Sequence, residues 1–242
     1  MTTLPTRHDE AWRYADLAAL ATIWPITPET ITVMPGETVA RTLVLAGTGT
    51  EVHDIAVTVG EGAQLALHVL NAAQGYGRVA LRVALARGSR FHFGAAQLAG
   101  GEHRVEIVTE VIHAEPDAVS RQIVRQVLAG RATGNYLGRV VVERGANGTD
   151  GEQSIRAMLL DRGASANARP ELEIYADDVK CAHGCAIGEL DKDALFYCAS
   201  RGLPPAAAKA LLLQAFLAEA FEDAQDEDTL TAAALSALET LL

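Results

Sequence analysis

The sequence predicts a mainly β fold: a β-solenoid core with a short N-terminal helix and a helical C-terminal subdomain. Three observations support this. Short β-type segments separated by glycine turns fill the chain from Thr30 onward. Turns of the type Arg-Gly-Ala followed by a polar residue recur at 144–147 and 162–165, which indicates a loosely repeating unit. The last fifty residues carry apolar side chains at helical spacing. A two-sheet jelly roll is the alternative.

Residues 1–29 are expected to form a short N-terminal helical segment. Asp9 is a suitable N-cap for a helix over 8–21, in which Trp12, Leu17 and Leu20 give a partial apolar stripe. Pro25 and Pro28 follow and end the helical pattern.

Residues 30–190 are expected to form the β core. In 78–85 the larger apolar residues alternate with arginine and alanine, which is typical of a strand with one buried face. Ten segments are predicted as strands: 38–45, 54–59, 64–70, 78–85, 90–93, 104–113, 120–128, 138–143, 154–160 and 171–175.

Residues 191–242 are expected to be helical. Asp191 or Asp193 can cap a helix that ends at Ser200, and Gly202 suits the position after its C-terminus. Pro204 and Pro205 begin a second helix through about residue 222, and a third follows the acidic stretch 222–228.

Composition excludes several classes of protein. The 242-residue chain has a formal net charge of −11, which argues against general affinity for nucleic acid or for anionic membranes. No secretory signal is visible over 1–10, and the longest apolar tract, 206–218, is too short to span a bilayer. We expect a cytoplasmic protein whose three cysteines remain thiols.

Two of the three cysteines flank a histidine in the stretch that precedes the helical tail. If this stretch is extended, Cys181, His183 and Cys185 point to the same side. Thiolate and imidazole bind zinc, copper and iron–sulfur species. Alternate side chains on a strand lie roughly 6.6 Å apart, so all three can converge on one ion only if Gly184 bends the chain. The spacing predicts part of a metal or cluster site, with other ligands from elsewhere. The alternative is that the cysteines are simply buried.

The other polar candidates are weaker. The histidines at 53, 68, 92, 103 and 113 are scattered among strands, and such residues are more often solvated or hydrogen-bonded in the core than ligands. Asp177 and Asp178 are adjacent and read best as a turn. The glycine turns lack the phosphate-binding pattern of an ATPase, so we expect no ATPase activity from this chain.

Two segments resemble one family. The run 172–203, which contains Lys-Cys-Ala-His-Gly at 180–184, resembles the C-terminal region of the SufB/SufD family of iron–sulfur cluster assembly proteins, and is closer to its SufD-type members. The Trp-centred segment 7–17 is similar to a helix that the family carries early in the chain. This chain looks shortened relative to that family, and Cys185 stands where a small or hydroxyl residue is expected.

The resemblance implies a right-handed parallel β-helix that works as a non-catalytic assembly scaffold. It implies a heterodimer with a SufB-like subunit, although a homodimer is possible here, and recruitment of the ATPase SufC by the C-terminal helices. Cluster assembly would involve His183, with Cys181 as a secondary ligand and Cys185 tentatively as a third. The SufC-facing surface would include Leu195, Phe196, Tyr197, Arg201, Leu211 and Phe216.

The number of donors bears on how a cluster of the kind that the resemblance implies would be held. A cluster held by four cysteines of one chain tends to be retained, and this chain cannot supply four. A cluster bound here would therefore be shared with another subunit, with sulfide or with exogenous ligands, and we expect a transient iron–sulfur cluster shared with a partner subunit. Flavin is possible for the complex. The alternatives are a β-rich metal-binding or storage protein that uses Cys181, His183 and Cys185, and a β-helix carbohydrate-active enzyme.

Overall fold

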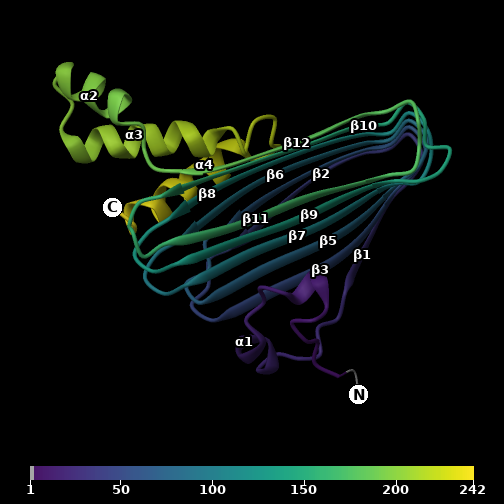
Figure 1. Cartoon of the computed structure of the whole chain (residues 1–242), viewed down its shortest axis with the longest axis horizontal. Coiled ribbons are helices and arrows are strands. Elements are labelled where there is room, and N and C mark those ends of the chain that lie inside the picture. The colour runs from purple at the N-terminus through teal and green to yellow at the C-terminus, as the bar shows by residue number, and fades with distance from the viewer. Residues whose placement is uncertain (1–2) are drawn as a thin grey trace.

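Two parallel sheets form the core of the computed structural model, which describes residues 3–242 (Figure 1). Odd- and even-numbered strands alternate between them, so each pair of successive strands makes one coil of a solenoid. The odd sheet contains β1 (Glu29–Val33), β3 (Thr50–Val59), β5 (Tyr76–Leu85), β7 (Arg104–His113), β9 (Thr133–Val142) and β11 (Ser165–Ile174). The even sheet contains β2 (Thr38–Leu45), β4 (Gln64–Asn71), β6 (Arg90–Ala99), β8 (Val119–Leu128), β10 (Asp150–Leu159) and β12 (Lys180–Gly188).

The solenoid expectation is confirmed, and the jelly roll is excluded because neighbouring strands in both sheets are parallel. Corresponding positions of successive coils lie side by side, as Val39, Leu65 and Phe91 do in the even sheet. The turns stack as well. Gly62, at φ +64°, donates its amide to the carbonyl of Arg87 at 2.9 Å, in a left-handed conformation that glycine adopts without strain.

The interior is filled by inward-facing aliphatic and aromatic side chains. The alternation expected over 78–85 is confirmed: Val79, Leu81, Val83 and Leu85 are all buried in the main core. Strand side chains point alternately to opposite faces, so every second residue of each strand contributes to this column. Its continuity through the coils is what holds the solenoid together.

Two C-terminal helices cover the outer face of the even sheet, and another lies beyond its edge. They are α2 (Lys192–Ser200), α3 (Pro205–Ala218) and α4 (Glu227–Glu239), and Figure 1 shows α3 and α4 along the sheet with α2 beyond its edge. A second apolar cluster joins them to the strands, with Phe216 and Leu230 meeting Leu70 and Val127. A side chain at Gly94 would lie 2.1 Å from the carbonyl oxygen of Ala220, so a glycine there permits this close approach.

The prediction of one continuous N-terminal helix over 8–21 is wrong. The structure has a 3-10 turn, η1 (Glu10–Trp12), and a separate α1 (Leu17–Ala21), both against the odd sheet (Figure 1). The Asp9 carboxylate accepts from Thr6 N instead of capping a helix, and Asp16 caps α1 through Ala19 N at 3.1 Å. Trp12, the last residue of η1, stacks on Arg78, with 4.1 Å from the guanidinium carbon to the ring centroid. The chain turns after this contact, between η1 and α1.

Several strand boundaries also differ from expectation. The strand predicted over 90–93 extends to Ala99 because Gly94, Ala95 and Ala96 are buried on both faces, which removes the alternation. The strand predicted over 171–175 is β11, and β1 was not predicted at all. Within residues 3–242, no helix has both the length and the apolar character needed to cross a membrane.

Candidate functional site

The stretch with two cysteines and a histidine is the last strand, β12. Its residues lie in register with β10: Cys181 beside Gly151, His183 beside Gln153 and Cys185 beside Ile155. In-register neighbours on parallel strands point the same way, and Gln153 and Ile155 face the interior. The three candidate ligands therefore share the interior side of the final coil.

The final coil leaves these side chains uncovered. In the part of the chain that the structure describes, β12 pairs only with β10 and β11 only with β9, so no further coil closes this end. Cys181 is half-buried against the core, whereas His183 and Cys185 are exposed. Further exposed apolar surface comes from Ile174 at the end of β11, from Tyr175 just after it and from Ile187 on β12. The candidate ligands thus lie on a solvent-facing, partly apolar strand pair.

The three ligands do not converge. Gly184 is not among the glycines with positive φ, and it lies within the regular strand β12 instead of bending it. Among residues 3–242, no group of three or more His, Cys, Asp or Glu side chains is arranged to hold a metal ion. Cys181, His183 and Cys185, here called the ligand row, therefore offer at most a partial set of ligands.

The surroundings of Cys181 and Cys185 raise the pKa of both thiols, which makes the metal-binding thiolate form less available. Burial raises the pKa of Cys181, and the hydrogen bond from the Gly151 backbone opposes this only in part. The pKa of Cys185 is raised too, because neighbouring protein atoms exclude part of the water from this otherwise exposed thiol. The positive charge of the neighbouring Lys180 does not offset this rise in the pKa of Cys181. Binding a metal ion requires each thiol to release its proton.

A buried polar layer lies directly behind the row, and the sequence reasoning missed it. Gln153 donates to the hydroxyl of Tyr136 at 3.3 Å, and Tyr136 donates to Gln122, also at 3.3 Å. His113 is fully buried, and its Nε2 lies 2.9 Å from Ser120 Oγ. The sequence could have indicated this layer through polar residues at inward-facing positions of strands, because buried polar groups need hydrogen-bond partners and seldom occur there by chance.

The C-terminal helices present a second exposed surface. Phe196 and Tyr197 on α2 have 75% and 59% of their area exposed, and Leu211 on α3 has 49%. Arg201 lies over the Tyr197 ring at 5.1 Å, and Leu195 is half-buried. Phe216 is different: it is buried between α3 and the even sheet, so it anchors the helix and is not part of the accessible surface.

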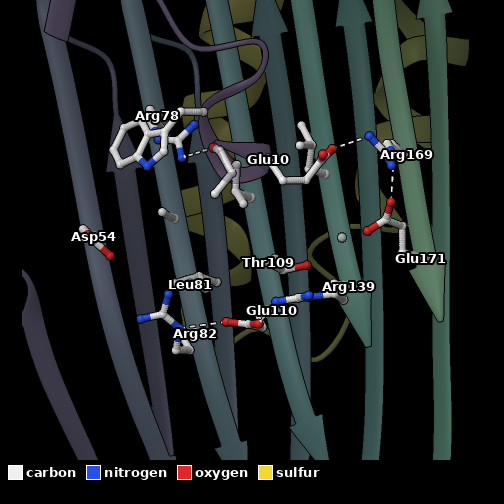
Figure 2. A pocket seen from close by; sticks show the side chains of 16 residues that line it. Glu10, Asp54, Arg78, Leu81, Arg82, Thr109, Glu110, Arg139, Arg169 and Glu171 are labelled. Carbon is white, nitrogen blue, oxygen red and sulfur yellow. Dashed lines mark hydrogen bonds and ion pairs between the residues drawn. The ribbon is translucent and has the colours of Figure 1, made fainter. Parts of the chain in front are cut away.

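A cavity of about 270 Å³ lies elsewhere, on the outer face of the odd sheet beside η1 (Figure 2). Its charged side chains pair with one another across neighbouring strands. Arg82 donates to Glu110 at 2.7 Å, and Arg139 contacts the same carboxylate and, at 3.2 Å, Glu173 on β11. Within β11, Arg169 contacts Glu171 at 2.7 Å. This pocket contains none of the candidate ligands, and its paired charges form a ladder that follows the register of β5, β7, β9 and β11.

A family model matches the greater part of this chain. Residues 38–216, from β2 to near the end of α3, match the model described as "SUF system FeS cluster assembly, SufBD core domain". The chain belongs to this SufBD family of the iron–sulfur cluster assembly system. The match includes β12 and all of α2, so the candidate ligands and the exposed aromatic surface both lie within the family's core domain.

Individual SufBD relatives match about half of the chain. The iron–sulfur cluster assembly protein SufD of Escherichia coli is 36% identical over 108 residues, which cover 45% of this chain and 26% of the relative. The chloroplastic protein ABCI7 of Arabidopsis thaliana is 37% identical over 124 residues, covering 50% of this chain and 26% of the relative. A SufBD family protein of Synechocystis is 38% identical over 104 residues, covering 43% and 23%. The chain thus aligns with about a quarter of the length of these relatives.

Family membership helps to decide among the functions that the sequence left open. The SufBD match is to a cluster assembly family, and it does not favour a metal storage protein or a carbohydrate-active enzyme. The family description names cluster assembly in the SUF system, and this is the functional class that the match supports.

Proposed function

We propose that this chain is a SufD-like scaffold subunit that holds a nascent iron–sulfur cluster together with a second subunit. His183 contributes the primary ligand and Cys181 a secondary one, while Cys185 is a tentative third. The observation that carries the proposal is the exposed row of soft donors on a strand that no further coil covers. The cluster is cargo, so incomplete ligation by one chain suits a group that must be passed on.

The second subunit is proposed to be SufB-like, with a second copy of this chain as the alternative. An exposed parallel strand with apolar neighbours is a surface that proteins normally protect, and a partner strand protects it by pairing. Ile174 and Ile187 supply apolar contact area there, at 42% and 47% exposure. Ligands from the partner would complete the coordination that this row cannot supply.

A SufC-like ATPase is proposed to dock on the C-terminal helices. Phe196, Tyr197 and Arg201 on and after α2, with Leu211 on α3, form an exposed aromatic and basic surface that the solenoid does not use. Aromatic and arginine side chains commonly supply most of the binding energy of an interface. Nucleotide hydrolysis would belong to that partner, and this chain would be non-catalytic.

The proposed reaction needs thiols, which a reducing cytoplasm provides. The structure has all three cysteines free. When a metal ion arrives, Cys181 releases the proton that its raised pKa retains, and His183 binds through a neutral ring nitrogen. Flavin use by the complex remains a prediction.

The decisive experiment is anaerobic reconstitution with iron and sulfide, with and without SufB- and SufC-like partners. His183→Ala should lower the cluster yield about 10-fold or more, because it removes the best exposed donor. His103→Ala, a partly exposed histidine on the turn before β7, is the matched control and should keep the normal yield. Normal yield from His183→Ala would refute the proposal, and full yield without any partner would favour the storage protein.

A further inference from the structure

Two histidines lie beneath the connection between α3 and α4, which comprises residues 219–226. His68 on β4 and His92 on β6 face outward, because the neighbouring Leu67 and Phe93 belong to the solenoid core. Their ring centroids are 5.3 Å apart. His68 is 1% exposed, and its buried Nε2 makes no hydrogen bond to any of residues 3–242. The pair belongs neither to the ligand row nor to the surfaces proposed for partners.

The connection packs closely over the His68 ring. Gly94 is the in-register neighbour of His68 on β6, and a side chain there would lie 2.1 Å from the Ala220 carbonyl oxygen and 2.6 Å from His68 Cδ2. Ala220 and Phe221 are each 1% exposed. Asp223 has a φ of +63°, which is uncommon for a residue other than glycine. The imidazole thus sits in a slot between the backbone of β6 and that of the connection.

Burial dominates the protonation of both rings. It lowers the pKa of His68 to about 4, with a smaller contribution from His92, and it also lowers the pKa of His92. Asp223 opposes both changes, and Glu222 opposes them through its backbone at His68 and through its charge at His92. Since Nε2 of His68 makes no hydrogen bond, the bond to the Glu222 backbone belongs to Nδ1. On the other side of His68, β2 contributes the uncharged Thr42.

We propose that His68 and His92 form an acid-sensitive latch beneath the α3–α4 connection. A second proton on His68 would lie on Nε2, where the closed structure of residues 3–242 offers no hydrogen-bond partner and a second imidazole lies close by. The ring regains its ordinary affinity for protons only when the connection lifts and water enters. Acid therefore opens the connection, and Glu219, which pairs with Arg125, moves with it.

The latch goes beyond the proposed function and does not depend on it. Its use by the molecule does, because α3 carries Leu211 of the surface proposed to dock a SufC-like ATPase. Opening the connection would loosen the hold of the solenoid on that surface.

The latch is tested by hydrogen–deuterium exchange on the full chain without partners, at pH 7.5 and pH 5. The amides of Ala220, Phe221 and Ala224 donate to backbone carbonyls at 2.9–3.0 Å, so their exchange reports opening of the connection. After correction for the intrinsic exchange rate at each pH, opening should increase about 20- to 30-fold at pH 5, the ratio for one imidazole whose pKa moves from about 4 to about 6.5. Peptides of β5, β7 and β9 should keep their protection.

Three variants assign the response to the histidine pair. His68→Gln keeps a polar side chain but cannot take up the proton, so its connection should open almost equally at both pH values. His113→Gln is the matched control: His113 is also buried, with a pKa of about 4, but it pairs with Ser120 inside the solenoid. It should retain the wild-type response. His92→Gln should weaken the response, and it serves if His68→Gln does not fold.

Three results would overturn the latch. The first is equal protection of the connection at the two pH values. The second is a parallel loss of protection in β5, β7 and β9, because acid would then unfold the whole molecule. The third is a full response in His68→Gln, which would assign the pH dependence to carboxylates such as those of Glu222 and Asp223.

Discussion

Arg78 and Glu106 form an ion pair that is almost completely removed from water. Arg78 Nη1 lies 2.6 Å from Glu106 Oε2, and the two side chains are 1% and 0% exposed. Tyr76 donates to the same carboxylate at 2.5 Å, and Arg78 Nη2 donates to the carbonyl of Ala11 at 2.7 Å. This arrangement attaches the N-terminal segment to the odd sheet.

Glu106→Leu should destabilise the protein by about 3–5 kcal/mol, because it leaves the Arg78 charge buried without its partner. Urea denaturation followed by circular dichroism measures this. The control is Glu102→Leu, which breaks an exposed pair with Arg131 and should cost less than about 1 kcal/mol. Similar losses in the two variants would contradict the buried pairing.

The sequence was sufficient to place the candidate ligands on one side of a strand but not to show what lies behind them. Alternation predicts the common side of Cys181, His183 and Cys185. It gives no information on Gln153, because its significance depends on Tyr136, which belongs to the other sheet and meets it only after coiling. Whether Cys181 is buried likewise depends on contacts from distant coils.

At the scale of elements, α3 is held to the even sheet by both apolar and ionic contacts. Arg125 on β8, itself only 4% exposed at its side chain, donates to Glu219 at 2.9 Å and 2.5 Å. The same guanidinium contacts the Ser154 carbonyl on β10 at 3.0 Å. Glu219 follows the last residue of α3, so the pair fixes the end of the helix.

Glu219→Gln should loosen α3 without disturbing the solenoid. Hydrogen–deuterium exchange measured by mass spectrometry should rise in 205–218, while the peptides of β4 to β8 keep their protection, because the ion pair is weakened and the apolar cluster remains. Glu239→Gln, an exposed change at the end of α4, is the control and should alter neither region. Unchanged exchange in α3 would show that the apolar contacts alone determine docking.

Elements with one buried face were predictable, and those whose surroundings come from elsewhere were not. The strands 38–45 and 104–113 have the predicted bounds because one side of each faces the core. β6 was predicted too short because α3 and α4 bury its second face. The N-terminal helix was predicted too long because the contact between Trp12 and Arg78 overrides local helical preference.

At the scale of the whole molecule, buried histidines make stability depend on pH. Burial and, to a smaller extent, the neighbouring His92 lower the pKa of His68 to about 4, although the Glu222 backbone and the Asp223 charge oppose the change. Burial also lowers the pKa of His113 to about 4. The unfolded chain takes up these protons near pH 6.5, so the folded state is favoured above that pH and loses stability as the pH falls toward 4.

The urea midpoint should therefore decrease between pH 7.5 and pH 5, by the equivalent of about 2 kcal/mol for each fully buried imidazole. His68→Leu removes one such group from beneath the α3–α4 connection, and the dependence of its stability on pH should be correspondingly weaker. A slope equal to that of wild type would show that His68 does not contribute.

Each coil of the solenoid touches only the coils before and after it. A gain or loss of coils near β1 and β2 would leave the surroundings of His183 unchanged, since Gln153, Tyr136 and the strand edge all belong to the last coils. Over evolutionary time, the length of such a molecule is therefore free to drift while its terminal chemistry stays constant.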